Sequence, residues 1–434
     1  MRKTRISLAV AAATMISAPA FATNGDELIG LGAQSRALGG TGVAAFYGAE
    51  NQLANPAMLG KAEGSEFVIG GTLFMPDVKA EATTAGPASR SSDADQNVIP
   101  EVSMATRLND NWTFGLGMYG TAGMGVDYRD QDDYDTGAGL FSARSALQLM
   151  KFVPTFAFNQ DNYGFGFSPV IQYGALDLNY RSMVDVTGDG IPDGVGTVGN
   201  GVSDDLGFGF DLGAYFDVNK DLTVAVAYQS AIEMEYDGQI TEAADGFMIG
   251  PDSMGVITSD KLEQPAQIKV GVAYTMNNWM LTADAKQIKW GDAEGYKDFG
   301  WDDQNVYGLG AKYSGNGYWV GFGYNYGEDP IDVLPADAGM ASYPNQAINM
   351  FNNHFFPAIV ESHYTLGGGY ELSKTMTLEG AVVYAPEVDK TIDTGTISDA
   401  FDDGSINGSV PYNGTSHEVK HSQLGYTVSL RMNF

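Results

Sequence analysis

The sequence predicts an all-β transmembrane protein, a 14-stranded antiparallel outer-membrane β-barrel plugged by a small N-terminal hatch. Three observations carry this prediction. A signal peptide begins the chain, apolar and polar residues alternate in many short segments, and short and long connections alternate between those segments. Barrels of the outer membrane have apolar residues facing lipid, polar residues facing the lumen, short periplasmic turns and long extracellular loops.

Residues 1–22 have the pattern of a secretory signal peptide. Arg2, Lys3 and Arg5 precede the apolar run "ISLAVAAATMISA", and the small residues Ala20 and Ala22 predict cleavage after residue 22. The run is too short for a transmembrane helix. The chain has no cysteine, so no disulfide framework supports the fold.

The composition narrows the class of partner. Glycine makes up 56 of 434 residues, nearly twice its usual share. The formal net charge of −31 argues against nucleic acid as a partner.

The last segment, "LGYTVSLRMNF", shows the alternation that predicts the strands. Every second residue from Leu424 to Met432 is apolar, which gives a strand one apolar and one polar face. By the same pattern we expect fourteen strands at 65–78, 97–108, 111–122, 144–159, 162–180, 204–218, 221–237, 261–276, 278–291, 303–314, 317–328, 360–373, 375–387 and 419–434.

The connections between these strands alternate in length. Short links such as "LNDN", "VNKD" and "SGNG" alternate with long links at 79–96, 123–143, 181–203, 238–260, 292–302, 329–359 and 388–418. This places every short turn in the periplasm and every long loop outside the cell. The barrel is therefore expected to occupy residues 65–434.

Residues 23–64 do not alternate and are rich in glycine and alanine. A fourteen-stranded barrel has a lumen wider than its own side chains fill, so we expect this segment to plug it as a hatch. Gly39, Gly40 and Gly42 would allow close backbone packing, and Pro56 restricts Asn55 to extended geometry. A disordered periplasmic tail is the alternative.

Several motifs resemble the FadL family of outer-membrane transporters of long-chain fatty acids and hydrocarbons. They are "GLGAQSRALGGTGVA" at 30–44, "NPA" at 55–57, "FVPTFAFNQDNYGFGFSPVIQY" at 152–173 and "FFPAIVESHYTLGGGY" at 355–370. The resemblance implies a monomeric barrel with an N-terminal hatch and no TonB coupling. The hatch and gating residues that it suggests are Arg36, Gly39, Gly40, Gly42, Asn55, Pro56 and Ala57.

The resemblance also implies a function, passive hatch-gated diffusion with lateral exit through an opening in the barrel wall. The expected substrates are long-chain fatty acids. Aromatic or alkane hydrocarbons are the alternative, because the family includes toluene- and xylene-uptake relatives. A general porin or adhesin is a more remote alternative. The four histidines and the lack of a serine-centred signature argue against an enzyme.

Apolar residues are dense in three expected loops, at 139–150, 246–257 and 345–360. If exposed, such clusters would bind a hydrophobic substrate, and packing of loop on loop is the alternative. The apolar candidates are Phe351, Phe355, Phe356, Phe247, Met248, Leu147 and Met150. For a substrate carboxylate the family resemblance suggests Arg181 and Lys297, with Arg144, Lys151 and Lys286 as rivals by strand parity.

Two further features of the wall follow from the resemblance. The third strand carries Gly115, Gly117, Gly120 and Gly123, which match the kinked strand at the family's wall opening. Close packing of a glycine-rich barrel is the alternative. His363 is expected to face the lumen beside Glu361, in a structural role.

The acidic loop "DVTGDGIPDG" resembles a calcium loop. It places Asp185, Thr187, Asp189 and Asp193 at positions 1, 3, 5 and 9. Gly196 stands at position 12, where a bidentate acid belongs, so an acidic turn is the alternative. No other cofactor is expected.

The chain ends on Phe434, which resembles the C-terminal signal read by barrel-assembly machinery. We therefore expect that machinery, outer-membrane lipid and lipopolysaccharide as further partners.

Overall fold

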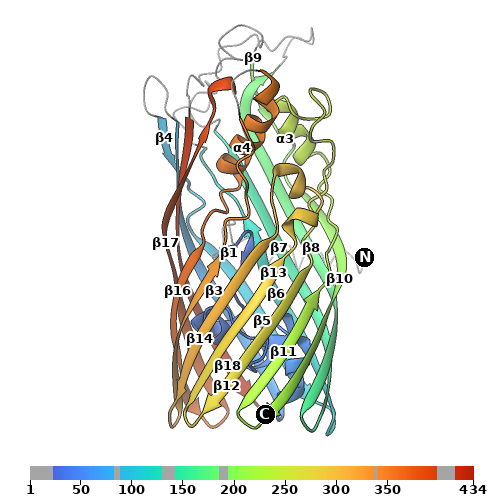
Figure 1. The fold of residues 1–434 in the computed structure, drawn as a ribbon, viewed down its shortest axis with the longest axis vertical. Coiled ribbons are helices and arrows are strands. Elements are labelled where there is room, and N and C mark those ends of the chain that lie inside the picture. The colour runs from blue at the N-terminus through green and yellow to red at the C-terminus, as the bar shows by residue number, and fades with distance from the viewer. Residues whose placement is uncertain (1–22, 83–87, 130–141, 185–193, 337–339, 398–415) are drawn as a thin grey trace, which may run out of the picture.

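The computed structural model describes residues 23–82, 88–129, 142–184, 194–336, 340–397 and 416–434. Within these ranges fourteen long strands form a closed antiparallel barrel (Figure 1). Their bounds are β3 Ser65–Ala82, β5 Asn97–Arg107, β6 Trp112–Met124, β7 Arg144–Gln160, β8 Tyr163–Val184, β10 Ser203–Asn219, β11 Leu222–Gln229, β12 Gln267–Met276, β13 Trp279–Ile288, β14 Gln304–Ser314, β15 Tyr318–Gly327, β16 Ser362–Ser373, β17 Met376–Asp393 and β18 Ser416–Asn433.

The barrel closes between its last and first strands. β18 pairs with β3 from His417↔Ala82 to Asn433↔Glu66, so the predicted fourteen-stranded antiparallel barrel is confirmed. The short turns and the C-terminus lie at one end, and the long connections lie at the other (Figure 1).

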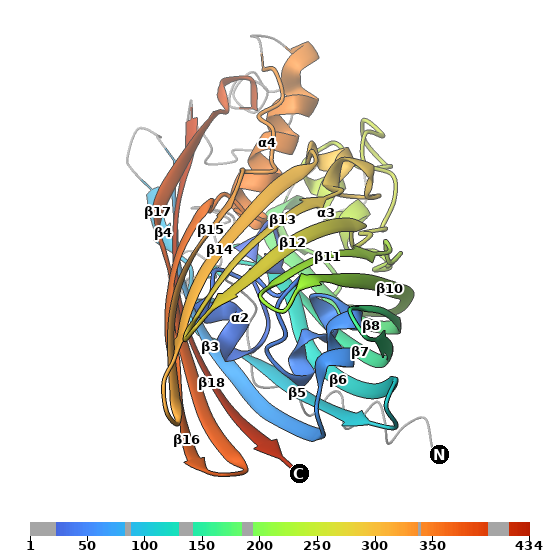
Figure 2. The same cartoon turned by 60° about the horizontal axis from the view of Figure 1, so that its bottom comes forward.

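Residues 23–64, called here the N-terminal segment, lie inside the lower half of the barrel (Figure 2). Most of their side chains are buried, so the segment is not a free tail. Its elements are β1 Thr23–Asn24, β2 Glu27–Leu28, α2 Gly32–Ala37, η1 Ala49–Leu53 and η2 Pro56–Lys61.

The long connections form a cap above the barrel. They contribute β4 Ala88–Ser91, β9 Gly194–Val198, α3 Ile240–Gly246, η3 Trp290–Asp292, η4 Lys297–Phe299, η5 Met340–Ser342 and α4 Tyr343–Phe355. In the described part of the chain, no helix has both the length and the apolar character needed to cross a membrane.

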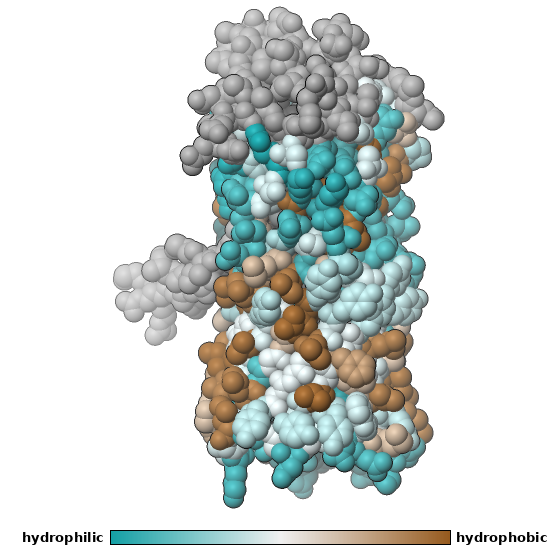
Figure 3. All heavy atoms as spheres, turned by 90° about the vertical axis from the view of Figure 1, so that its left-hand side faces the viewer, coloured by the Kyte–Doolittle hydropathy of each residue, from teal (hydrophilic) through white to brown (hydrophobic). Residues whose placement is uncertain are grey.

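Side-chain parity in the wall follows the sequence alternation. On β18 the Val428 side chain is 59% exposed, whereas Ser429 is fully buried and its hydroxyl donates to Glu101 Oε1 at 2.6 Å. Figure 3 shows apolar residues gathered over the lower half of one outer face and hydrophilic residues over the upper half. The apolar half is the height at which lipid surrounds the barrel.

Two predicted strands are shorter than their sequence pattern. The alternation predicts strands to 237 and from 261, but β11 ends at Gln229 and β12 begins at Gln267. The residues between them continue above the wall, where isolated bridges join Ile232 to Gln264 and Glu235 to Lys261. Alternation persists because Ile232, Met234 and Tyr236 are buried in the cap while the residues between them are exposed. An extended chain with one buried face has the same period of two as a strand with a lipid face.

Depth in the membrane should decide the effect of a charge on β18. Val428→Arg places a charge against lipid and should destabilise the barrel by about 2–4 kcal/mol. Ser422→Arg is the matched control, because residue 422 shares the outward face of β18 and pairs with Asp77, an acidic residue above the apolar band. Urea titrations of barrels folded in liposomes would measure both, and equal losses would contradict the proposed depth of β18.

Candidate functional site

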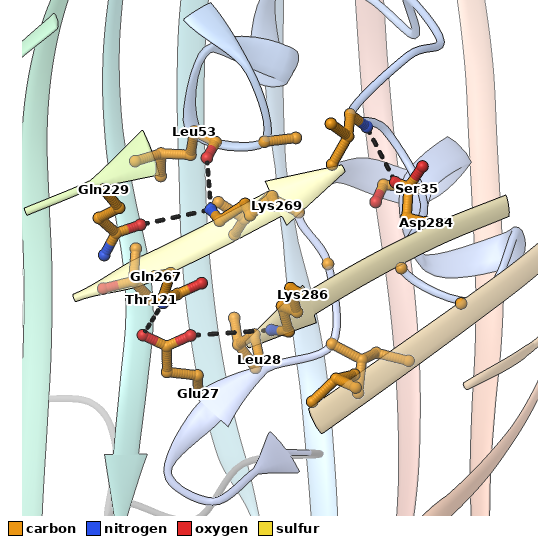
Figure 4. A pocket seen from close by; sticks show the side chains of 18 of the residues that line it. Glu27, Leu28, Ser35, Leu53, Thr121, Gln229, Gln267, Lys269, Asp284 and Lys286 are labelled. Carbon is orange, nitrogen blue, oxygen red and sulfur yellow. Dashed lines mark hydrogen bonds and ion pairs between the residues drawn. The ribbon is translucent and has the colours of Figure 1, made fainter. Parts of the chain in front are cut away.

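A cavity of about 110 Å³ lies between the N-terminal segment and the inner wall. Its apolar lining comes mostly from the segment, including Leu28, Ile29, Leu31, Val43 and Leu53. Its polar lining comes mostly from the wall. Figure 4 shows Lys269 and Lys286 projecting inward from neighbouring strands toward Glu27 and Leu53 of the segment. The cavity therefore has an apolar floor beside a charged wall.

Three lysines of the wall line this cavity, and two of them have partners. Lys269 Nζ donates to Leu53 O at 3.2 Å and to Gln229 Oε1 at 3.4 Å. Lys286 Nζ lies 3.8 Å from Glu27 Oε2. Both ammonium groups thus hold the N-terminal segment to the wall.

The third lysine, Lys151 on β7, is in a different position. Its side chain is only 4% exposed, and within the described ranges its ammonium makes no hydrogen bond or ion pair. Asp26 and Asp211 influence it electrostatically, without contact. A charged group with so little exposure and no bonded partner favours a bound anion in the cavity that it lines.

The carboxylates that line the cavity hold the N-terminal segment in place. Asp284 Oδ2 accepts hydrogen bonds from Gly42 N at 2.7 Å and from Val43 N at 2.9 Å. Glu27 accepts from Gln267 Nε2 and faces Lys286. These carboxylates therefore already bind the segment or its contacts, as Lys269 and Lys286 do. Among the lining lysines, Lys151 is the one whose ammonium stays available to a ligand within the described ranges.

A β-bulge in the wall lies next to Lys151. The register between β6 and β7 shifts between Gly120 and Ala122, and Tyr119 on β6 pairs with Lys151 on β7. The N-terminal segment covers this bulge, because Glu27 pairs with Ala122 and Gly123 N donates to Asp26 O at 3.0 Å. The cavity, the lysine and the irregular part of the wall thus adjoin one another.

Only part of the glycine series predicted to mark the kink belongs to it. Gly120 and Gly123 flank the bulge. A Cβ on Gly115 would lie 2.3 Å from Leu59 of the N-terminal segment, and one on Gly117 would meet the Tyr119 ring at 2.2 Å. These two glycines are therefore closely packed, and their place at a wall opening stays a prediction.

The residues expected to form the hatch have separate local roles. Gly39 and Gly40 have φ angles of 68° and 75°, and a Cβ on either would meet backbone oxygen within 2.5 Å. Asn55 Nδ2 donates to Val43 O at 2.8 Å, while its Oδ1 accepts from Ala57 N at 3.0 Å. Asn55 therefore both shapes the turn at Pro56 and ties two parts of the segment together.

The remaining members of that set are Arg36, Gly42 and Ala57. Arg36 is almost fully buried and donates to Gly30 O at 3.3 Å. Gly42 supplies one of the amides bound by Asp284, and Ala57 is fully buried.

A buried ion network that the sequence did not indicate fixes the lower side of the segment. Arg431 on β18 contacts Glu50 Oε1 and Glu66 Oε1, each at 2.6 Å, and Glu379 Oε2 at 2.9 Å. Glu50 belongs to the N-terminal segment, whereas Glu66 and Glu379 belong to the wall. No local pattern pointed to this cluster, because its members are far apart in the chain.

The aromatic residues of the loops are not an exposed binding surface, contrary to that reading of the sequence. Phe351, Phe355, Phe356 and Phe247 are all at most 8% exposed. They pack on one another, with ring centroids 4.9 Å apart for Phe351 and Phe355. The alternative, packing of loop on loop, is correct because α4 buries its apolar side in the cap.

Three other apolar candidates also lie outside the cavity lining. Leu147 is fully buried in the cap cluster, and Met248 packs against that cluster. Met150 is half-buried and next to Lys151 in β7, so it faces the opposite side of the wall.

The two cations suggested by resemblance are displaced from the cavity. Arg181 Nη1 donates to Thr197 Oγ1 at 3.0 Å near the top of β8, and Lys297 is exposed in η4. Among the rivals, Lys151 and Lys286 line the cavity, whereas Arg144 pairs with Asp177.

The expected pair of Glu361 and His363 is not formed. His363 is buried with its Nε2 atom 3.3 Å from Gln423 Oε1. Glu361 precedes β16 and accepts from Asp329 N at 3.3 Å. The two side chains thus take different partners.

The predicted calcium ligands Asp185, Thr187, Asp189 and Asp193 lie outside the described residues. Within the described ranges, no group of three or more histidine or acidic side chains is arranged to hold a metal ion.

Comparison with known proteins decides the family. Residues 9–434 match the family described as "Outer membrane protein transport protein (OMPP1/FadL/TodX)". The chain belongs to this family. It is therefore an outer-membrane protein, and the family's members are transport channels for hydrophobic compounds.

Individual relatives are distant but cover most of the chain. A "Long-chain fatty acid transport protein" of Escherichia coli O6:H1 is 23% identical over 390 residues, which are 79% of this chain and 85% of the relative. The toluene transporter TodX of P. putida has a TM-score of 0.64 at 20% identity, over 93% of this chain and 99% of its own. A Pseudomonas aeruginosa FadL homologue reaches 0.67 at 14% identity, over 94% and 100%.

Removal of Arg431 should release the N-terminal segment. Arg431→Met leaves two buried carboxylates, Glu50 and Glu379, and the half-buried Glu66 without their cation. The loss should cost about 3–5 kcal/mol. The expected result is a folded barrel in which the segment is cleaved by protease added from the periplasmic side. Lys220→Met, at a side chain that is 89% exposed, is the matched control. Equal protection in both variants would show that the network does not hold the segment.

Proposed function

We propose that this member of the family moves long-chain fatty acids across the outer membrane by passive diffusion. The head-group end of the acid enters the cavity between the N-terminal segment and the inner wall, with its carboxylate on Lys151. It leaves sideways at the bulge in β6 when residues 23–28 move away from the wall.

The position of Lys151 carries this proposal. A fatty acid needs an apolar trough and one cation, and a charge-assisted hydrogen bond to a buried ammonium is among the stronger single contacts. The cavity offers Leu28, Ile29 and Leu31 for the chain and Lys151 for the head group. An uncharged hydrocarbon would leave this ammonium without a partner.

The contacts between the N-terminal segment and the bulge support a gate. Glu27 pairs with Ala122, so residues 23–28 close the lumen beside the irregular stretch of β6. A ligand shifts such an equilibrium only by binding the open state more tightly than the closed one. A carboxylate bound to Lys151 would favour the open state if its negative charge weakens the contacts of the nearby Glu27 with Gln267 and Lys286.

Other expected partners are consistent with the fold and remain part of the proposal. The Phe434 side chain is 79% exposed at the end of β18, where barrel-assembly machinery would read it. We propose a monomer surrounded by lipid and lipopolysaccharide. Calcium binding at residues 185–193 stays a prediction, and calcium-dependent protection of that loop from protease would be its sign.

Uptake of radiolabelled oleate tests the substrate. In cells lacking their own transporter, the chain should speed oleate entry, and Lys151→Met should reduce it about 10-fold or more, from loss of about 1.5–3 kcal/mol. Lys151→Arg should retain more activity than Lys151→Met. Lys220→Met is the surface control.

A parallel arm with labelled toluene separates the two substrate classes. Faster toluene entry that Lys151→Met leaves unchanged, without faster oleate entry, would show a hydrocarbon channel. If neither compound enters faster than in empty cells, the transporter proposal fails.

A reversible cross-link tests the gate. The chain has no cysteine, and Glu27 and Ala122 are direct cross-strand partners, which suits a disulfide. Glu27→Cys with Ala122→Cys should block oleate uptake when oxidised and restore it on reduction. The pair Glu371→Cys with Thr377→Cys, which joins the neighbouring wall strands β16 and β17 away from the cavity, is the matched control. Equal uptake by the oxidised and reduced gate variant would exclude movement at this contact.

A further inference from the structure

The four histidines of the chain are all buried. His354 lies on α4, His363 on β16, and His417 and His421 on β18. None is more than 7% exposed, and none lines the cavity described above. Their hydrogen bonds determine which ring nitrogens carry protons.

The upper pair joins α4 to β18. Asn353 Nδ2 donates to Lys390 O at 3.2 Å and to His417 O at 3.3 Å, which fixes the orientation of the amide. The same nitrogen lies 3.0 Å from His417 Nδ1 and, as an amide nitrogen, cannot accept a proton from it. His417 Nδ1 is therefore an acceptor, and the proton of the neutral ring is on Nε2. That proton is donated to His354 Nδ1, 3.2 Å away, so His354 carries its own proton on Nε2.

The lower pair joins the chain after α4 to the N-terminal segment. His421 Nδ1 donates to Pro357 O at 2.7 Å, and its Nε2 accepts from Gln423 Nε2 at 3.2 Å. Gln423 Oε1 accepts from His363 Nε2 at 3.3 Å and from Thr23 N at 3.2 Å. Three hydrogen bonds in series thus connect Pro357, below the cap helix, with Thr23 of β1.

A second proton does not fit three of these rings. In His354, His417 and His421 the unprotonated ring nitrogen accepts a hydrogen bond from an N–H group. Protonation would set two donors against each other and would put like charges on His354 and His417. A protonated ring must therefore break its contact with α4, with β18 or with Gln423.

We propose that these histidines form an acid-sensitive lock between the extracellular cap and the N-terminal segment. At neutral pH the neutral rings hold α4 against β18, and Gln423 holds Thr23. In acid, α4 separates from β18, and Gln423 loses the orientation that binds Thr23 N. This inference concerns control of access and does not depend on which substrate is carried.

Several other charged or titratable groups lie around the four histidines. Tyr128 packs on His354 at a centroid distance of 5.0 Å, and the Lys390–Asp329 ion pair lies beside Asn353. Asp77 acts electrostatically on His421, and Arg36 and Lys286 act on His363. Cleavage after residue 22 makes Thr23 N the α-amino group, and its charged form in acid can still donate to Gln423. Of these, Asp77 and Asp329 are carboxylates, so their response to acid must be separated from that of the rings.

Spin labels on the full-length chain in liposomes test the lock. The labels are placed at Asn345→Cys on α4 and Thr391→Cys on β17, in a chain with no other cysteine. Burial disfavours the charged ring, so the change is expected below the ordinary imidazole range of about 6.5. Lowering the pH stepwise from about 7.5 to about 3.5 should shift the distance distribution reversibly to longer and broader values. The background with His354→Gln and His417→Gln should keep the neutral distance throughout.

An Asp77→Asn background controls for the carboxylate and should respond like the parent. A shift of equal size in the double glutamine background would overturn the proposal, and so would a parent distance that does not change with pH.

If the glutamine variant does not fold, the native histidines give a second test. With only four histidines, nitrogen-15 spectra of the rings should show neutral His421 protonated on Nδ1 and neutral His417 protonated on Nε2 at pH near 7.5. The opposite tautomers would exclude the relay.

Discussion

The width of a fourteen-stranded barrel is the constraint on which the rest of this structure depends. Such a lumen is too wide to be filled by the side chains of its own wall, so residues 23–64 fill it instead. The segment has little regular structure, and its backbone groups need partners in the wall. Asp284 and Lys269 supply such partners above, and Arg431 binds Glu50 below.

This division of labour also defines the candidate site. The charged residues of the wall that touch the segment are used to seat it. Lys151 is left beside the bulge in β6 without a bonded partner in the described chain. The same pairing that covers the bulge, Glu27 with Ala122, borders the cavity, so occupation of the cavity and the seating of residues 23–28 are physically linked.

The sequence allowed the barrel to be predicted well because alternation is local. Val428 and Ser429 face opposite sides, as period two requires. The prediction was wrong where burial in the cap imitates a lipid face, as at Ile232. The expectation that Phe351 and Phe355 are exposed was also wrong, because both are buried in the cap. A high density of apolar residues in the sequence does not distinguish an exposed surface from a packed one. Parity selected Arg144, Lys151 and Lys286, and only the last two line the cavity. Resemblance selected Arg181 and Lys297, which lie away from it because the loops of distant relatives do not align closely. The Arg431 cluster joins residues hundreds of positions apart, and no local pattern reports such contacts.

The molecule that stays with the barrel during purification tests the central claim most directly. The chain would be extracted in mild detergent, and the bound compounds would be identified by mass spectrometry in the native protein and in Lys151→Met. The account predicts a long-chain monocarboxylic acid in the native protein that is depleted in the variant. An uncharged hydrocarbon, or an acid retained equally by both proteins, would contradict the role given to Lys151.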